Sequence, residues 1–156
     1  MDNTLAPLRV FVVEDSPIML ELLVRAVQAA GAEVTGHSDS AKEAAAALSL
    51  VQTDLIILDI KLRAGNGFDV LRALQAAGHT HSAIKIIFTN FASPEYRELS
   101  FQLGANAFFD KTSEGSQALE FINRLAARRR NLGNHPSGQE RRQTNRPLSP
   151  WIGNRN

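Results

Sequence analysis

Residues 54–70 read DLIILDIKLRAGNGFDV, and this stretch decides the fold. The four apolar residues 55–58 lead directly into Asp59, and two glycines follow at Gly65 and Gly67. An uninterrupted apolar run of this length is typical of a strand buried on both faces, as in parallel sheets. Open α/β folds place their functional groups at the carboxyl edge of such a sheet. Asp59 is therefore either a surface turn residue or a reacting group at that edge.

The rest of the first 127 residues repeats this alternation of apolar runs and helical segments. Apolar runs that predict strands occur at residues 8–15, 32–38, 54–60, 83–91 and 105–110. Segments that predict helices follow them at residues 16–31, 40–52, 67–78, 93–104 and 116–130. Ser16-Pro17 and Ser93-Pro94 are signals for a helix N-cap and first turn. Five βα units in succession predict an α/β fold, a doubly wound parallel sheet with helices on both faces.

The composition excludes several classes of protein. Cysteine is absent, which excludes disulfide scaffolds, thiolate metal sites and cysteine nucleophiles. The N-terminus MDNTLAPLRVFVVED lacks the basic start and long apolar segment of a signal peptide. No apolar run is long enough to cross a bilayer. We therefore expect a soluble, cytoplasmic protein without membrane contact.

Charge divides the chain at residue 128. The whole chain carries +1, and residues 128–156, with seven arginines and one glutamate, carry +6, so residues 1–127 carry −5. The tail is rich in Asn, Pro, Gly and Ser and has no apolar period, which predicts a flexible extension or linker. A basic tail suits a solvated end or an arm for nucleic acid, and we favour the first. The acidic body argues against nucleic-acid binding by the domain itself.

The predicted strand ends carry the residues capable of chemistry. Glu14 and Asp15 end the first strand, Asp59 follows the apolar run of the third, Thr89 lies near the end of the fourth, and Lys111 follows the fifth. In a doubly wound sheet these positions converge at one edge. Three carboxylates so placed repel one another unless a cation neutralises them, and their hard oxygen ligands suit Mg²⁺. The ammonium of Lys111 and the hydroxyl of Thr89 suit a phosphoryl group carried on a carboxylate.

Each of these residues also has a purely structural explanation. Glu14 and Asp15 could simply meet the positive end of the helix that follows them. Thr89 could be an ordinary strand residue, and Lys111 a solvated loop lysine. The joint placement of all five residues at successive strand ends favours one functional site over a separate structural explanation for each residue.

This ordered set of motifs resembles the receiver domain of two-component response regulators over about residues 8–127. VVEDSP resembles the acidic pair of that family, and LIILDI its phosphoacceptor strand, with Gly67 eight residues after Asp59. IIFTN matches the strand that ends in a hydroxyl residue, thirty positions past Asp59, and AFFDK matches the strand that ends in a lysine, twenty-two positions past Thr89. The resemblance, which extends to stand-alone receivers of the chemotaxis type, implies a flavodoxin-like (βα)5 domain with strand order 2-1-3-4-5.

The resemblance also implies a role for each residue at the strand ends. Asp59 would accept a phosphoryl group from a phosphohistidine on a histidine kinase or phosphotransfer protein. Thr89 and Lys111 would bind the phosphoryl oxygens. Mg²⁺ would have four ligands from the chain: the side chains of Glu14, Asp15 and Asp59 and the backbone carbonyl of Lys61.

Two further pairs of residues acquire roles from the resemblance. Phe108, three residues before the lysine, falls on the switch aromatic of the family, which turns inward as the threonine, here Thr89, moves toward the phosphoryl group. The two residues would form a two-state element, and the charge of the phosphoryl group would shift the equilibrium between its two states. Lys61 and Phe91 lie two residues past Asp59 and Thr89, where the family admits the hydrolytic water. We expect both side chains to slow self-hydrolysis.

The sequence departs from the family pattern at a few positions. Arg63 stands where the family usually has proline, and Thr112 follows Lys111 where a proline after a cis peptide bond is usual. Because a cis bond without proline is costly, we expect that bond to be trans. Asn90 replaces a small residue after Thr89. None of these departures removes a reacting group.

Three classes of function fit these observations to different degrees. The first, which we favour, is a signalling switch that binds a downstream protein according to the phosphorylation of Asp59 and catalyses only its own phosphorylation and dephosphorylation. The second is a degenerate receiver that binds a partner without phosphorylation, and the complete set of acids, threonine and lysine argues against it. The third, a flavodoxin-like enzyme or nucleotide binder, lacks a G-x-G-x-x-G motif or P-loop. Because no second folded domain follows, we expect the DNA-binding or enzymatic output of the signal to lie in another protein. Whether the domain forms a homodimer is left open by the sequence.

Overall fold

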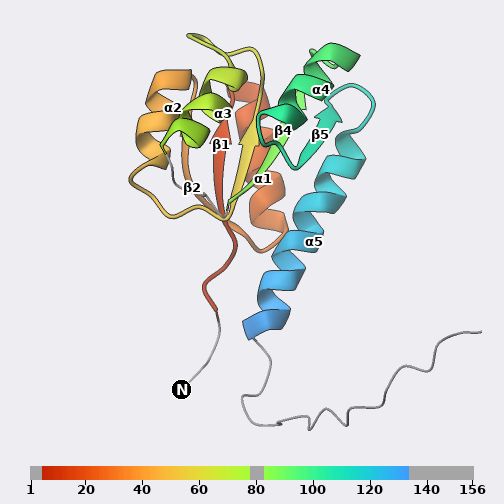
Figure 1. The fold of residues 1–156 in the computed structure, drawn as a ribbon. Helices are drawn as coiled ribbons and strands as arrows, with labels where there is room; N and C mark the ends of the chain where they lie inside the picture. Colours follow the sequence, from red (N-terminus) through yellow and green to blue (C-terminus); the bar gives the residue numbers. More distant parts are fainter. Residues whose placement is uncertain (1–4, 78–82, 134–156) are drawn as a thin grey trace, which may run out of the picture.

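The computed structural model describes residues 5–77 and 83–133, which form a five-stranded parallel sheet with helices on both faces (Figure 1). The strand order is β2-β1-β3-β4-β5, which confirms the predicted doubly wound α/β fold. In chain order the elements are β1 (Arg9–Val13), α1 (Pro17–Ala29), β2 (Glu33–Ser38), α2 (Ala41–Leu48), β3 (Leu55–Leu58), α3 (Gly67–Ala76), β4 (Ile84–Thr89), α4 (Pro94–Gln102), β5 (Ala107–Asp110) and α5 (Gly115–Gly133). None of the helices in these two ranges is long and apolar enough to cross a membrane.

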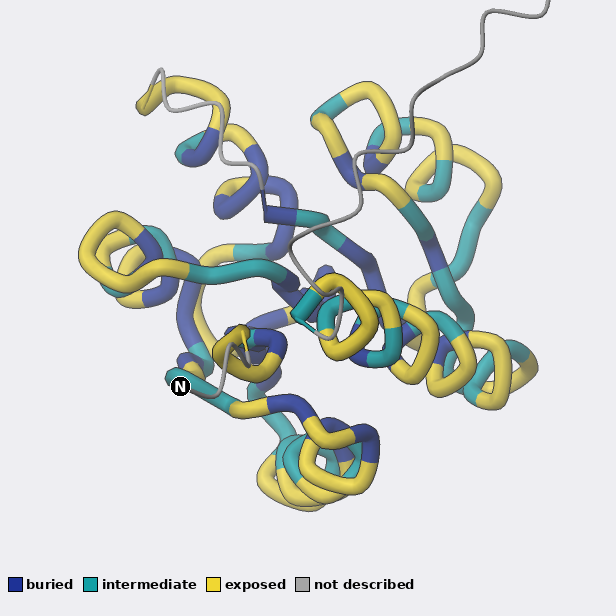
Figure 2. Tube along the Cα trace, turned by 90° about the horizontal axis from the view of Figure 1, so that it is seen from below, coloured by how far each residue is buried: buried dark blue, intermediate teal, exposed yellow. Residues whose placement is uncertain are grey.

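Two apolar clusters, one on each face of the sheet, hold the helices in place. The first includes Leu48 of α2 and Leu71 of α3, and the second includes Val27 of α1 and Ile122 of α5. Figure 2 shows this arrangement from below, with buried strands at the centre and exposed outer faces on the helices. All four residues of β3 are buried and they contribute to both clusters, which confirms the predicted two-sided burial of residues 55–58.

Serine caps start two of the helices at the positions that the sequence predicts. Ser16 Oγ accepts a hydrogen bond from the Met19 amide at 3.3 Å, and Ser93 Oγ accepts one from the Tyr96 amide at 3.1 Å. A proline occupies the first turn of both helices. The caps satisfy amides that have no partner within the helix. They fix the starts of α1 and α4 close to the ends of β1 and β4.

The helix α5 ends three residues beyond the predicted end at residue 130, and two arginines anchor its last turns. It continues six residues into the predicted basic tail. Arg129 Nε donates to the Ala6 carbonyl at 3.1 Å, and Arg130 Nη1 donates to the Ala30 carbonyl, at the end of α1, at 2.6 Å. The first part of the predicted tail is therefore an ordered helix whose arginines bind the domain. The rest of the tail lies outside the described residues.

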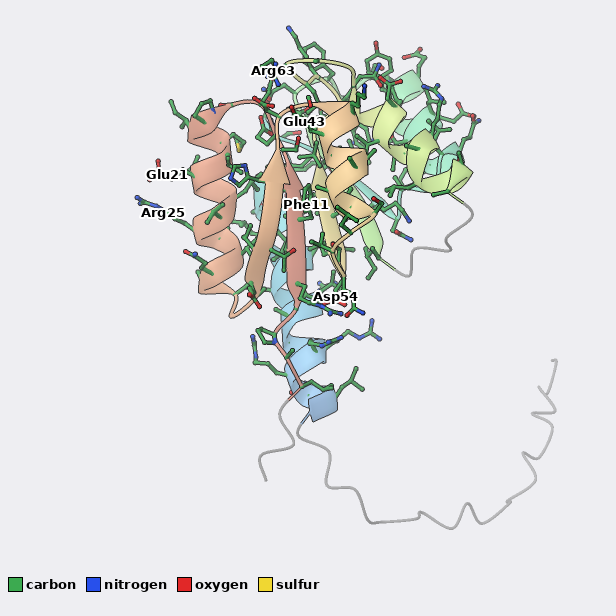
Figure 3. The ribbon with its side chains drawn as sticks, turned by 90° about the vertical axis from the view of Figure 1, so that its left-hand side faces the viewer. Phe11, Glu21, Arg25, Glu43, Asp54 and Arg63 are labelled. Carbon is green, nitrogen blue, oxygen red and sulfur yellow. The ribbon has the colours of Figure 1, made fainter. Side chains whose placement is uncertain are left out.

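An ion pair between Arg9 and Asp54 lies at the amino edge of the sheet, the lower end in Figure 3. The guanidinium donates to both oxygens of the carboxylate at 3.0 Å, and the Arg9 amide donates to it at 2.8 Å. Arg129 of α5 lies 3.7 Å from the same group. Burial alone would raise the pKa of Asp54, but the hydrogen bonds from Arg9 outweigh burial and hold this pKa below its ordinary value. The charged carboxylate thus joins β1, the start of β3 and α5.

We predict that Asp54→Asn lowers the free energy of unfolding by about 1.5 to 3 kcal/mol at neutral pH, the range for hydrogen bonds to a charged group. Because the pKa of Asp54 is lower in the folded protein, the stabilisation is complete above the pKa of the unfolded chain, about 3.9. It disappears as pH falls through the lower folded value. Urea unfolding of both proteins across this pH range measures the effect.

The matched control for this measurement is Glu21→Gln, which breaks an exposed pair with Arg25 on α1. Exposed pairs of this kind contribute little, so we expect a change below about 0.5 kcal/mol. An equal loss in the two variants, or a loss in Asp54→Asn that persists in acid, would contradict the role of the Asp54 charge.

Candidate functional site

Four neighbouring strands bring the five predicted residues to one edge of the sheet. Glu14 and Asp15 follow β1, Asp59 follows β3, Thr89 ends β4 and Lys111 follows β5. Sheet-like hydrogen bonding continues past the strand ends, since the amides of Asp59 and Lys111 each donate to a carbonyl of the neighbouring strand at 2.9 Å. The backbone is therefore rigid where these side chains emerge. The predicted convergence at the carboxyl edge is found.

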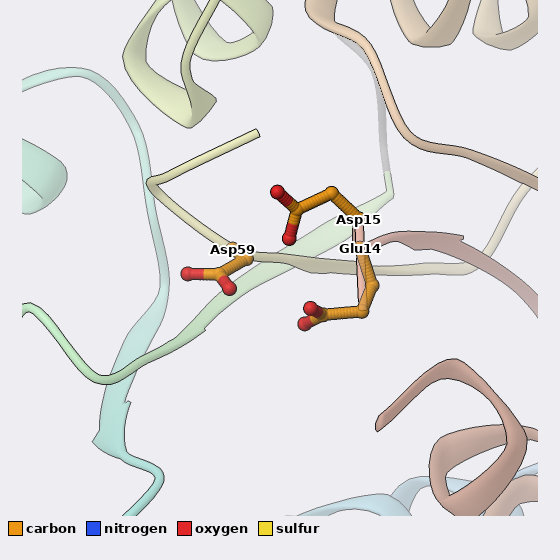
Figure 4. A group of neighbouring side chains, drawn as sticks. All are labelled: Glu14, Asp15 and Asp59. Atoms are coloured by element: carbon orange, nitrogen blue, oxygen red, sulfur yellow. The ribbon is translucent and has the colours of Figure 1, made fainter. Parts of the chain in front are cut away.

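The carboxylates of Glu14, Asp15 and Asp59 form a compact acidic cluster (Figure 4). One oxygen from each lies within 4.8 Å of the others, and within the described part of the chain no other acidic or histidine residues group in this way. Glu14 and Asp59 are buried, whereas Asp15 is partly exposed. The cluster is thus shielded on its inner side and open to water on one side. Such a set of hard oxygen donors fits a divalent cation that keeps several water ligands.

Lys111 neutralises part of this acidic cluster. Its Nζ lies 2.7 Å from Glu14 Oε2 and 2.7 Å from Asp59 Oδ2, and its side chain is only 6% exposed. Burial alone would lower the pKa of Lys111, but the hydrogen bonds to Asp59 and Glu14 outweigh burial and raise it. Burial raises the pKa of Glu14, and the nearby charge of Asp59 adds to this, against the hydrogen bond from Lys111. The ammonium is therefore held charged between two carboxylates.

Thr89 and Phe108, the predicted switch pair, are both inside the protein. Thr89 is fully buried, and its Oγ1 accepts a hydrogen bond from the Phe91 amide at 3.1 Å. Phe108 is 3% exposed and belongs to the apolar cluster beneath α2, α3 and α4. Because the threonine hydroxyl accepts from Phe91, its own proton is left to donate to an incoming oxygen.

The two predicted tuning residues, Lys61 and Phe91, contact each other. The Nζ of Lys61 lies 5.6 Å from the centre of the Phe91 ring, a cation–π arrangement. Both residues are exposed, and they come from the loops after β3 and β4 that carry Asp59 and Thr89. The sequence predicts a role for each, but their mutual contact could not be deduced from spacing.

The turn after β3 depends on a glycine at residue 67. A methyl group on Gly67 would overlap the carbonyl oxygen of Asp59, so the start of α3 packs against the backbone of the candidate phosphoacceptor. The Gly67 amide donates to the Ile60 carbonyl at 2.8 Å, and the Ile60 amide donates to Asp59 Oδ1 at 2.7 Å. The approach of the helix thereby fixes the orientation of the Asp59 carboxylate.

Arg63 also restrains the loop after β3, through contacts with Asp39. Its guanidinium binds both oxygens of Asp39 at 2.9 and 3.0 Å, and its amide donates to the Asp39 carbonyl at 3.0 Å. The Ala41 amide donates to the Ala64 carbonyl at 2.9 Å. Figure 3 shows Arg63 at the end of the sheet opposite Asp54. The sequence shows the departure from proline at this position but carries no signal that identifies Asp39 as the partner of Arg63.

The loop that carries Lys111 is held by hydrogen bonds where the family usually has a proline. Asp110 Oδ1 accepts from the Thr112 amide at 2.8 Å, and the Asp110 carbonyl accepts from the Glu114 amide at 2.8 Å. The carboxylate of Glu114 in turn binds the guanidinium of Arg97 at 2.8 Å. The described peptide bonds include no cis bond, which confirms the expected trans bond between Lys111 and Thr112.

The chain is similar to known receiver proteins over most of the described fold. The family model of the response regulator receiver domain matches residues 10–123. The gliding motility regulatory protein of Myxococcus xanthus is 33% identical over 123 residues, which cover 76% of this chain and 15% of that protein. The probable transcriptional regulatory protein SilR of Salmonella typhimurium is 28% identical over 121 residues, which cover 78% of this chain and 52% of that protein. The chain therefore spans only part of the length of these two relatives.

Solved structures of receiver domains have the same fold. The chemotaxis protein CheY4 of Vibrio cholerae is 25% identical, with a TM-score of 0.68 and coverage of 77% of this chain and 99% of that chain. The receiver domain of the sensor histidine kinase PA1611 of Pseudomonas aeruginosa is 21% identical, with a TM-score of 0.67 and coverage of 78% and 99%. That second structure holds a magnesium ion coordinated in its active-site cleft.

We predict that Gly67→Ala lowers the free energy of unfolding by about 1 to 3 kcal/mol, the usual cost of forcing extra atoms into a packed site. The added methyl group has no space beside the Asp59 carbonyl. Gly115→Ala is the matched control, because a methyl group there meets nothing within 4 Å. Urea unfolding of both variants measures the difference, and equal stabilities would show that α3 does not press on the Asp59 backbone.

Proposed function

Because the chain belongs to the family of response regulator receiver domains, we propose that it is a phosphoacceptor switch. Asp59 accepts a phosphoryl group from a phosphohistidine on a histidine kinase or phosphotransfer protein. The phosphorylated form then binds a downstream protein differently. The observation that carries this proposal is the position of Lys111, whose ammonium is held 2.7 Å from the carboxylates of Glu14 and Asp59.

The proposed cofactor is Mg²⁺, which supplies positive charge next to the phosphoryl oxygens when it is bound. Its proposed ligands are the side chains of Glu14, Asp15 and Asp59 and the backbone carbonyl of Lys61. The spacing of the three carboxylates and the partial exposure of Asp15 support this assignment. The magnesium ion in the PA1611 receiver domain, which shares the fold, supports it as well.

In the proposed transfer, a carboxylate oxygen of Asp59 attacks the phosphorus, the P–N bond of the phosphohistidine breaks, and the imidazole leaves with the electron pair. The Ile60 amide orients the Asp59 carboxylate through its bond to Oδ1 at 2.7 Å. Lys111 binds Oδ2 of Asp59, so it is placed to pair with an oxygen of the phosphoryl group once that group is attached to Asp59. The hydroxyl of Thr89, at the end of the next strand, is a donor for a second phosphoryl oxygen.

The proposal covers the receiver function alone. Its partners are an upstream kinase or phosphotransfer protein and an unidentified downstream protein, and its setting is the cytoplasm. The domain, proposed for residues 8–127, catalyses only its own phosphorylation and dephosphorylation.

We predict that the protein takes up one phosphoryl group from acetyl phosphate when Mg²⁺ is present and loses this uptake when the metal is chelated. Asp59→Asn abolishes uptake, because an amide oxygen is a far weaker nucleophile than a carboxylate. Intact-protein mass spectrometry measures the uptake. Asp54→Asn, at the opposite edge of the sheet, is the control that keeps it. Unchanged uptake in Asp59→Asn contradicts the assignment, and no uptake by the wild-type protein favours a receiver that binds partners without phosphorylation.

Lys61 and Phe91 are proposed to prolong the phosphorylated state. Their cation–π contact joins the loops after β3 and β4 beside the candidate phosphoacceptor. The Phe91 amide is fixed by its hydrogen bond to Thr89 Oγ1. A ring and a long side chain that support each other in this place limit the approach of water to the phosphorus.

We predict that Phe91→Ala and Lys61→Ala each shorten the half-life of the phosphorylated protein by about tenfold, equivalent to about 1.4 kcal/mol of barrier. Because the two side chains support each other, the double variant should lose less than the sum of the single losses. Decay of the phosphorylated form by mass spectrometry measures this. Phe101→Ala is the control, because Phe101 is exposed to a similar degree, 47% against 44%, on the last turn of α4. An unchanged half-life in both single variants would remove the proposed shielding.

A further inference from the structure

Arg97 of α4 makes three contacts, two of them with the predicted switch aromatic Phe108. Its guanidinium carbon lies 4.6 Å from the centre of the Phe108 ring. Its Nη1 donates to the carbonyl of Phe108 at 3.3 Å, and its Nη2 donates to Glu114 Oε1 at 2.8 Å. The Arg97 side chain therefore joins α4 to the ring and backbone of a β5 residue and to the segment that leads into α5. The arginine covers the ring and fixes the backbone on which the ring is mounted.

The acidic partner of Arg97 is itself fixed. Glu114 Oε1 also accepts from the Asp110 amide at 3.2 Å, and the Glu114 amide donates to the Asp110 carbonyl at 2.8 Å. The Glu114 carbonyl accepts from the Ala118 amide in the first turn of α5. The backbone of Glu114 belongs to this turn and its carboxylate binds the Asp110 amide, so Arg97 is bound to a partner that is itself restrained.

The ring of Phe108 lies inside the protein, and the contacts that Arg97 makes with it involve no phosphoryl group. It is 3% exposed and lies in the core cluster against which Leu99 and Leu103 also pack. The family resemblance implies a ring that turns inward on phosphorylation. A modification can change an equilibrium only to the extent that it favours one state over the other. If the ring is held inside in both states, phosphorylation cannot act by turning it.

We propose that Arg97 is a positioning residue that holds Phe108 inward before phosphorylation, so that the α4–β5 surface of this chain is preset. Phosphorylation then acts on the neighbouring Thr89 and the loops of the site rather than on the ring. The statement about phosphorylation rests on the proposed phosphoacceptor function, whereas the role of Arg97 does not. Loss of the arginine turns Phe108 into a mobile ring whose position depends on phosphorylation.

Fluorine NMR of protein labelled with 4-fluorophenylalanine tests this proposal. The chain has eight phenylalanines, and Phe108→Leu identifies the signal of residue 108. Broadening by a soluble gadolinium chelate reports the exposure of that ring. In the unphosphorylated wild-type protein we expect the signal to be protected, and to change little when beryllium fluoride and Mg²⁺ are added as a phosphoryl mimic.

We expect Arg97→Gln to increase the broadening of the Phe108 signal several-fold, and Glu114→Gln to do the same to a smaller extent. Arg97→Lys keeps the cation and restores part of the protection. The phosphoryl mimic restores protection in Arg97→Gln. Arg124→Gln is the matched control, because it removes an arginine from an exposed i,i+4 pair with Glu120 on α5.

The proposal would be overturned if the Phe108 signal is exposed in the wild-type protein. It would also be overturned if the signal is as well protected in Arg97→Gln and Glu114→Gln as in the wild-type protein. Loss of thermal stability without a change in broadening would show that Arg97 has a merely structural role. The comparison of unphosphorylated proteins needs no phosphoryl transfer, so it decides the role of Arg97 even if Asp59 accepts no phosphoryl group.

Discussion

The ammonium group of Lys111, 2.7 Å from the carboxylates of both Glu14 and Asp59, is the interaction on which the site depends. It reaches from the end of β5 across β4 to the ends of β3 and β1, so it joins strands far apart in the chain. All three side chains are nearly excluded from water. Buried charges are tolerated only when they are well paired, and here one cation faces two anions with Asp15 beside them. The remaining negative charge is what a divalent cation would balance.

The framework around this group of charges is rigid, and parts of it are particular to this chain. The two-sided burial of β3 fixes the backbone behind Asp59, and the close approach at Gly67 fixes the turn after it. At the two positions where the family usually has proline, hydrogen bonds and ion pairs restrain the loops instead. Arg63 does so through Asp39, and the Lys111 loop is restrained by Asp110 and Glu114. Side-chain and backbone contacts thus restrain the chain at both positions.

Apolar periodicity and parallel topology predict the doubly wound sheet, the burial of β3 and the meeting of the acidic residues with Lys111, whereas the strand order follows from the family resemblance. The sequence does not predict the partners of Arg63, Arg97 and Arg129. Such partners depend on how loops and helices approach one another in space, and periodicity carries no information about that. The same holds for the last turns of α5, whose arginines also fit a solvated tail in the sequence and whose partners, the carbonyls of Ala6 and Ala30, appear only in the structure. The contact of Arg97 with the ring of Phe108 likewise joins two separate elements, α4 and β5.

In the proposed function Asp59, among the three clustered carboxylates, forms the acyl phosphate. Borohydride reduction tests it most directly, because it converts an aspartyl phosphate into homoserine, which peptide mass spectrometry locates. After treatment with acetyl phosphate and Mg²⁺, we expect homoserine at position 59 and unmodified Glu14 and Asp15. Reduction product at either of those two residues, or a phosphoryl group found on any other side chain, would contradict it.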